Sequence, residues 1–246
     1  MRNYKQETEK RIEYIREQLK TAGATGIVFG NSGGKDSALV GILCRMACED
    51  TLGVQLPVSK RNFDEDLRDG LEIAERFNIE TRVVALDGVR DKLFEALAPV
   101  AELSDMARAN ASSRLRMVTL YAIAASENRL VAGTGNRSES HVGYFTKWGD
   151  GACDFNPIAD LTVTEVYEFL RYLSATDAIL TKAPSGALYD GQTDEDELGI
   201  TYAAIDKYLL TGEANESDRE KIDGFYRRAQ HKRGMPSTYN DKEEKL

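Results

Sequence analysis

The stretch Gly26–Ser37, which reads GIVFGNSGGKDS, decides the fold of this chain. An apolar run at 27–29 leads into a small-residue turn at 32–34, and apolar residues at helical spacing follow from Asp36. This order predicts a strand, a tight turn and a helix. Two glycines admit backbone angles that other residues avoid, and the N–H groups of the turn can converge on an anion. We therefore expect a phosphate-binding turn.

Two familiar phosphate-binding patterns do not fit this stretch. A Walker A loop needs Ser or Thr after Gly-Lys and another Gly five residues before the second Gly. Here Asp36 follows Lys35, and Phe29 occupies the earlier position. The glycine spacings of a Rossmann turn are absent as well. The hexapeptide at 32–37 instead resembles the pyrophosphate loop of the N-type ATP pyrophosphatases, although a plain glycine turn remains the alternative.

The composition describes a globular protein and excludes several function classes. The chain has 246 residues, of which 41% are hydrophobic and 30% charged, enough for one α/β domain with a large core. Its longest apolar runs fall short of the ~20 residues that span a membrane, and the N-terminus lacks a signal core. The net charge of −9 opposes a broad nucleic-acid surface. We expect a cytoplasmic protein with no membrane or nucleic-acid partner and with three free thiols.

Strand and helix patterns alternate along the chain. Apolar β-like runs at 27–29, 53–57, 80–86 and 129–134 are separated by helical segments. This alternation predicts a parallel sheet with helices on both faces. The resemblance to the N-type ATP pyrophosphatases implies that it is a doubly wound, five-stranded α/β sheet like the adenine nucleotide alpha hydrolase fold. We expect a single domain over 1–246, with a frayed tail at 241–246. The predicted helices cover 4–19, 36–50, 63–77, 89–97, 106–127, 162–173, 194–209 and 218–229, with a loop at 182–193.

A second glycine turn, Gly133–Glu139, also follows a predicted strand. In sheets of this kind ligands sit beyond the carboxyl ends of the strands, so both turns should face one site. Glu139 could join Asp36 on one magnesium ion, because that ion is usually held by one or two carboxylates and substrate phosphates. Alternatively, Glu139 only occupies the first turn of a helix, where the dipole favours an acid.

Three further segments could bind a substrate. Tyr, Phe, Lys, Trp and Asp lie between the glycines of Gly143–Gly151, which suits a pocket for a flat ring, or else an aromatic edge loop. On the helix at 106–127, Arg114 and Arg116 point different ways, so one could meet phosphate while the other serves the core or an interface. The basic triplet at 231–233 could clamp phosphates or a carboxylate, or simply be solvated.

Taken together and in this order, these motifs resemble ammonia-dependent NAD synthetase. The matching segments are Ser32–Ser37, Asn110–Met117, Gly133–Glu139, Gly143–Asp150, Pro184–Ser185, Gly191–Ile200 and His231–Pro236. The resemblance implies that ATP adenylates the nicotinate carboxylate of deamido-NAD and releases pyrophosphate. Ammonia then displaces AMP to give NAD. It also implies a homodimer. Because no glutaminase segment is present, we expect the nitrogen source to be free ammonia or a separate partner.

The resemblance further implies a role for individual residues. Asp36 and Glu139 are expected to hold Mg2+, and Asp150 and Lys147 are expected to be catalytic. Asp150 would be a buried carboxylate that takes a proton from ammonium. The expected ATP-binding residues are Ser32, Gly33, Gly34, Lys35, Asp36, Ser37, Arg114, Thr134 and Ser185. The expected deamido-NAD-binding residues are Tyr121, Tyr144, Lys147, Asp154, Glu197, His231 and Lys232.

One position departs from the family pattern. Many members carry a phosphate-contacting lysine where this chain has Val163, so Lys35 or Lys182 would have to substitute, or the phosphate grip differs. Two other functions therefore stay open. The chain could be a related ATP pyrophosphatase that adenylates a different acid, or a nucleotide-binding regulator without catalysis.

Overall fold

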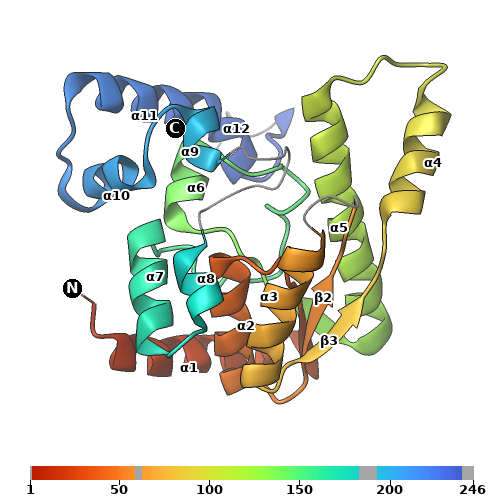
Figure 1. Ribbon diagram of the computed structural model, residues 1–246, viewed down its shortest axis with the longest axis vertical. Coiled ribbons are helices and arrows are strands. Elements are labelled where there is room, and N and C mark those ends of the chain that lie inside the picture. Colours follow the sequence, from red (N-terminus) through yellow and green to blue (C-terminus); the bar gives the residue numbers. More distant parts are fainter. Residues whose placement is uncertain (1, 59–62, 183–192, 240–246) are drawn as a thin grey trace.

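The computed structural model describes residues 2–58, 63–182 and 193–239 (Figure 1). Within these ranges four parallel strands form one sheet in the order β3-β2-β1-β4. The strands are β1 Gly26–Gly30, β2 Thr51–Gln55, β3 Glu80–Val83 and β4 Arg129–Val131. In β1, Val28 pairs with Leu52 on one side and with Val131 on the other. A strand covered on both faces needs apolar residues throughout, which explains the run at 27–29.

The parallel α/β prediction is confirmed, but the described part of the chain has four strands rather than five. Beyond β4, Ala132 pairs with Phe155 in an isolated parallel bridge. The Asp154 carboxylate accepts the Val131 N–H at 2.8 Å, and Pro157 has no N–H to donate to a ladder. Pairing therefore stops after one residue, and the fifth strand does not develop.

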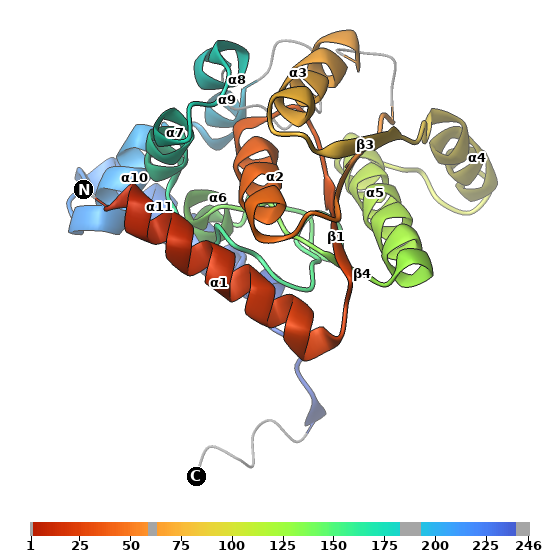
Figure 2. The same ribbon diagram turned by 90° about the horizontal axis from the view of Figure 1, so that it is seen from below.

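Helices cover both faces of the sheet (Figure 2). Their bounds are α1 Tyr4–Ala22, α2 Lys35–Ala47, α3 Phe63–Arg76, α4 Asp87–Leu97, α5 Asp105–Glu127, α6 Arg137–Val142, α7 Val163–Tyr172, α8 Asp177–Thr181, α9 Asp194–Leu198, α10 Tyr202–Thr211, α11 Glu216–Arg228 and α12 Gln230–Arg233. The main core joins β1 to α1, α2 and α7, and a second core lies between the strands and α5. A third apolar cluster joins α6, α10 and α11.

The predicted helix at 194–209 is wrong in one respect, because it is two helices. Gly199 ends α9 with φ +62°, a left-handed conformation that favours glycine, and α10 starts at Tyr202. None of the helices in the described ranges has the length and apolarity to cross a membrane. The tail predicted at 241–246 lies outside the described residues.

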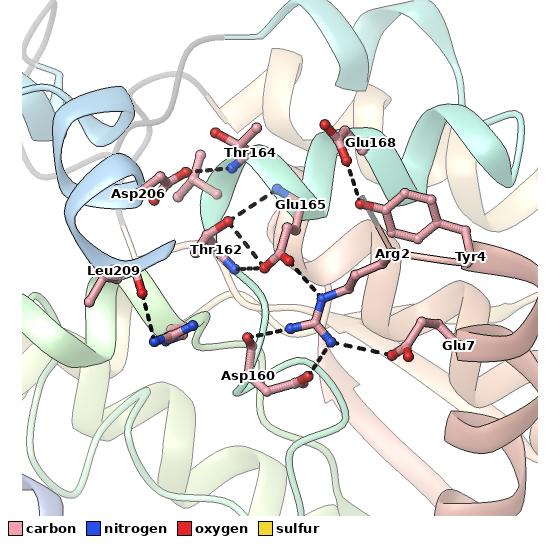
Figure 3. Close-up of polar contacts among 12 residues, drawn as sticks. Arg2, Tyr4, Glu7, Asp160, Thr162, Thr164, Glu165, Glu168, Asp206 and Leu209 are labelled. Atoms are coloured by element: carbon pink, nitrogen blue, oxygen red, sulfur yellow. Dashed lines mark hydrogen bonds and ion pairs between the residues drawn. The ribbon is translucent and has the colours of Figure 1, made fainter. Parts of the chain in front are cut away.

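An ion-pair cluster ties the N-terminal segment to the start of α7. We call it the N-terminal cluster; it comprises Arg2, Glu7, Arg11, Asp160 and Glu165. Figure 3 labels its members other than Arg11. Arg2 donates to Glu165 at 2.7 Å and to Asp160 at 2.9 Å. Glu165 also completes a capping box with Thr162, the helix start that the sequence predicts.

The topology places the two glycine turns side by side. β1 is followed by α2 and then by β2 on one side, whereas β4 joins the sheet on the other side of β1 after α5. The turns after β1 and β4 therefore leave neighbouring strands at the same carboxyl edge, where open α/β sheets bind ligands.

Candidate active site

The turn after β1 depends on one of its two glycines for its shape. Gly33 has φ +70°, and a Cβ there would collide with the backbone carbonyl oxygen of Asp66 on α3. Gly34 has φ −99°, a conformation open to any residue. The expectation that both glycines need unusual angles therefore holds for Gly33 only.

Hydroxyl groups and free N–H groups line this turn. Ser32 Oγ and Ser37 Oγ are 3.1 Å apart, Ser32 Oγ accepts the Gly34 N–H at 3.3 Å, and Ser37 Oγ donates to the Gly34 carbonyl at 3.0 Å. No side chain caps the start of α2. The first-turn N–H groups of α2 can therefore receive an anion, as the sequence predicts.

The turn after β4 is held by a residue that sequence analysis did not single out. Asn136 is fully buried, and its side-chain oxygen caps α6 by accepting a hydrogen bond from the Glu139 N–H. In return, the backbone N–H of Asn136 donates to the Glu139 carboxylate. Its Nδ2 also donates to Asp36 Oδ1 at 3.1 Å. Asn136 thus links the two turns. The Asn-x-x-Glu spacing of a capping box was the available signal.

Lys35 lies between the two expected metal ligands; Lys35, Asp36 and Glu139 form what we call the acid pair cluster. Lys35 Nζ is 2.7 Å from Asp36 Oδ2 and 3.8 Å from Glu139 Oε1. Burial and the nearby Asp36 charge raise the pKa of Glu139 to about 8, against the opposing effect of Lys35. Burial acts to lower the pKa of Lys35, but the Asp36 and Glu139 charges outweigh it and raise that pKa.

The acid pair fits a magnesium ion. Among the described residues, no three His, Cys, Asp or Glu side chains gather in a way that could hold a metal. Two carboxylates are nevertheless a usual protein contribution to Mg2+, with phosphates and water completing the shell. The Lys35 ammonium stands in for such a cation, because it reaches Asp36 directly and lies within 4 Å of Glu139.

The structure explains the departure at Val163. Its side chain is buried in the third apolar cluster, together with Tyr202. Of the two candidate substitutes, Lys182 donates to Asp66 at 2.7 Å and to Asp69 at 2.6 Å. Lys35 is the one that lies in the acid pair cluster.

Tyr202, which sequence analysis did not single out, lies beside the acid pair cluster. Lys35 Nζ is 5.9 Å from the centre of the Tyr202 ring, and the Tyr202 hydroxyl donates to the buried Asp194 at 3.2 Å. Burial, Glu139 and Asp194 raise the pKa of Tyr202. Asp194 belonged to a recognised motif, but no pattern indicated that its partner would be Tyr202.

Several predicted substrate residues shape the loop at 143–151. Arg114 donates to the Lys147 carbonyl at 3.1 Å, and Lys147 Nζ donates to the His231 carbonyl at 2.6 Å. Lys232 Nζ donates to the carbonyls of Gly143 and Phe145, each at 2.9 Å. Of the basic triplet, Lys232 therefore holds the loop backbone, whereas Arg233 donates to the carbonyls of Ser140 and His141 on α6. Arg116 donates to the Leu56 carbonyl instead, so the two arginines do point different ways.

Four of the residues expected to bind deamido-NAD meet in two pairs. The Tyr121 hydroxyl donates to Asp154 at 3.2 Å, and the Tyr144 hydroxyl donates to Glu197 at 2.8 Å. Burial and the carboxylate partner raise the pKa of both tyrosines. Each hydroxyl therefore stays protonated and able to donate at neutral pH.

Asp150 is exposed, so the expectation of a buried carboxylate is wrong. Its Oδ1 accepts from Ser113 Oγ at 2.7 Å and from the Thr146 N–H at 3.0 Å, which fixes it on the loop. Thr134 is half-buried in the turn after β4, and His231 is exposed. Ser185 lies outside the described residues.

Known proteins share this arrangement over nearly the whole chain. The model of the NAD synthase family matches residues 7–245. The NH3-dependent NAD+ synthetase of Carboxydothermus hydrogenoformans is 46% identical over 237 residues, which cover 95% of this chain and 97% of the relative.

Two solved structures show the same fold. An NMN synthetase from Francisella tularensis superposes with a TM-score of 0.93 at 36% identity, covering 98% of this chain and 100% of that chain. An NH3-dependent NAD synthetase from Campylobacter jejuni gives a TM-score of 0.80 at 30% identity, covering 97% and 99%. With the glycine turns and acid pair described above, these matches establish that the chain belongs to the NAD synthase family.

Proposed function

We propose that this chain, acting as one domain, is a ligase that amidates deamido-NAD with ammonia at the expense of ATP. The products are NAD, AMP and pyrophosphate, formed through an adenylated nicotinate carboxylate. The observation that carries the proposal is the meeting of Asp36 and Glu139 beside the phosphate-type turn, through Lys35 and Asn136. An attack by a carboxylate on a phosphate needs positive charge and N–H donors at that place.

In this proposal the turn after β1 binds the phosphates of ATP. The N–H groups of the first turn of α2 and the hydroxyls of Ser32 and Ser37 face the pyrophosphate that leaves. Asp36 and Glu139 would hold Mg2+, which when bound neutralises phosphate charge. The remaining proposed ATP contacts are Gly33, Gly34, Lys35, Arg114, Thr134 and Ser185.

The second substrate is proposed to bind around the loop at 143–151. Tyr144 with Glu197, and Tyr121 with Asp154, offer paired hydroxyls and carboxylates, the polar groups that orient a ribose and a nicotinate ring. Lys147, His231 and Lys232 complete the proposed set. Orientation matters most here, because holding the carboxylate in line with the α-phosphate removes much of the barrier.

Asp150 is proposed to accept the proton of ammonium, which has no free electron pair until it is deprotonated. Its exposure lets ammonium reach it from solvent, while Ser113 and Thr146 hold one oxygen in place. Asp150→Asn should slow the amidation step by about 100-fold and spare adenylation. Single-turnover measurements of AMP-ester formation and of NAD formation separate the two steps; equal losses would contradict this role.

The reaction is tested directly with purified protein, ATP, Mg2+ and ammonium. Deamido-NAD should give stoichiometric NAD, AMP and pyrophosphate, read by chromatography. AMP release with another acid but not with deamido-NAD would favour a different ATP pyrophosphatase. Nucleotide binding without turnover on any acid would favour a regulator.

One observation supports a second acid for the same chemistry. The TM-score of 0.93 with the Francisella tularensis NMN synthetase exceeds the 0.80 with the Campylobacter jejuni NAD synthetase. Nicotinate mononucleotide is therefore the second candidate substrate. A side-by-side comparison of kcat/KM for the two acids decides which is preferred.

The proposal also includes a homodimer in the cytoplasm. Large apolar side chains lie exposed on and near α4 and α5, among them Val89, Val100, Met106 and Val118. Such side chains suit a contact with a second copy. The three cysteines are free thiols, as a reducing compartment favours. Light scattering of the purified protein measures the oligomeric state.

A further inference from the structure

The cation that already belongs to the acid pair cluster is Lys35. Its side chain is only 7% exposed, and its ammonium donates to Asp36 at 2.7 Å and lies 3.8 Å from Glu139. Each carboxylate is also fixed from outside the cluster, because Asn136 donates its side-chain amide to Asp36 and its backbone N–H to Glu139. The two acids are thus held facing a single cation position.

We propose that Lys35 is a built-in counter-cation of the Asp36–Glu139 pair, and that a divalent metal must displace its ammonium from that pair. The inference rests on the metal site named in the proposed function. Without a cation, these two partly buried carboxylates would repel one another and lose part of their hydration. Lys35 offsets both costs in the metal-free protein, and it competes with Mg2+ for the same oxygens.

The displaced ammonium needs a new anion, and bound phosphate can supply one. Lys35 is the first residue of α2, directly after the turn at 32–34 where phosphates are proposed to bind. Two tyrosines, Tyr202 and Tyr167, are also described near its ammonium. Neither is an anion at neutral pH, and the Tyr202 ring accepts a cation only weakly. A metal ion alone therefore competes with the Lys35 ammonium for the two carboxylates. A metal ion that binds together with a nucleotide also supplies a phosphate with which the displaced ammonium can pair. Lys35 makes metal binding depend on nucleotide.

The test measures two affinities that should change in opposite directions. Binding of Mn2+, followed by electron paramagnetic resonance with Mg2+ as competitor, is compared in wild type and Lys35→Met. Removing a positive charge within about 4 Å of the metal should tighten Mn2+ binding roughly tenfold or more. At saturating Mn2+, the non-hydrolysable analogue AMPCPP should bind roughly tenfold more weakly, because one phosphate partner is lost.

The control variant is Lys92→Met, which removes the same charge from an exposed i,i+3 pair with Glu95 on α4. Both affinities should stay at the wild-type value. Asp36→Asn and Glu139→Gln should each weaken Mn2+ binding. If they do so while Lys35→Met leaves Mn2+ affinity unchanged, the counter-cation role is wrong and the metal site stands. If neither acid variant weakens binding, the proposed metal site fails as well.

Lys35→Met leaves two facing carboxylates and could prevent folding. The double variant Lys35→Met/Glu139→Gln removes one charge of each sign and is compared with Glu139→Gln alone. Removal of Lys35 should again tighten Mn2+ binding at the remaining Asp36, and equal affinities in these two variants would overturn the proposal.

Discussion

The N-terminal cluster and the acid pair cluster have the same formal charge when every group is ionised, but the pKa values of Glu165 and Glu139 shift in opposite directions. The first holds two arginines and three carboxylates, the second one lysine and two carboxylates, so each carries −1. Burial acts to raise the pKa of Asp160 and of Glu165, but hydrogen bonds from Arg11 and Arg2 outweigh it and lower both. The pKa of Glu139 rises to about 8.

Hydrogen-bond donors, rather than net charge, explain this difference. Guanidinium groups present several N–H donors in a fixed plane, and Arg11 alone reaches both oxygens of Asp160 and one of Glu7. Lys35 has a compact ammonium that bonds to Asp36 and stays 3.8 Å from Glu139. The carboxylates of the N-terminal cluster therefore receive direct hydrogen bonds from guanidinium groups, whereas Glu139 in the acid pair cluster meets its cation only at 3.8 Å.

The sharpest test of this comparison replaces one aspartate in each cluster. Asp36→Asn should lower AMP formation by about 10²–10³-fold with little change in Tm, because it removes a group proposed to act on the reacting phosphates. Asp160→Asn should lower Tm and leave kcat near wild type. Pyrophosphate release and thermal unfolding are measured on both. Full activity in Asp36→Asn would show that Asp36 does not act on the reacting phosphates.

A second test removes the buried arginine. Arg11→Met should lower the free energy of unfolding by about 2 kcal/mol, because Arg11 is 8% exposed and its loss leaves the Pro157 carbonyl and two carboxylates short of donors. Urea titration gives this quantity, and Arg16→Met on the exposed face of α1 is the control. A variant as stable as wild type would show that the N-terminal cluster contributes little.

The pH dependence of stability should have opposite signs in the two clusters. Glu139 has a folded pKa of about 8, above its ordinary 4.5, so the folded state binds the extra proton. In a chelator, its contribution to stability should fall as pH rises from about 5 to 8. Glu165 has a lowered pKa, so its contribution is present at neutral pH and is lost as pH falls below about 4.5.

Urea titrations of Glu139→Gln and Glu165→Gln across pH 3–9 measure both slopes. In wild type the free energy of unfolding should decline above pH 5, and Glu139→Gln should remove that decline. Glu165→Gln should remove part of the decline that occurs at acid pH. One unit of pKa difference between the folded and unfolded states corresponds to about 1.4 kcal/mol, so both slopes are measurable. Parallel curves for wild type and both variants would show that the two clusters do not differ in this way.

Sequence patterns predicted most of the strands and turns that position the candidate active site. The strand–turn–helix at 26–37 and a second turn after a later strand were enough, because parallel strands bring their carboxyl ends to one edge. The side-chain contacts across that edge could not be predicted from the sequence. That Asn136 would bond to Asp36, or that Asp150 would be exposed, depends on tertiary packing between segments about 40 to 100 residues apart. The missing fifth strand likewise depends on an Asp154 side chain that competes for a ladder N–H.

The hydrogen bonds from Lys232 to the backbone of the loop at 143–151 bear on how members of the family can diverge. Lys232 bonds to the main-chain oxygens of Gly143 and Phe145, and Arg114 bonds to that of Lys147. Main-chain oxygens are the same whatever amino acid carries them. Apart from its glycines, where an added Cβ would collide with neighbouring atoms, the loop can therefore change its side chains and keep these bonds. The groups that it presents to the proposed second substrate can thus vary on one backbone shape.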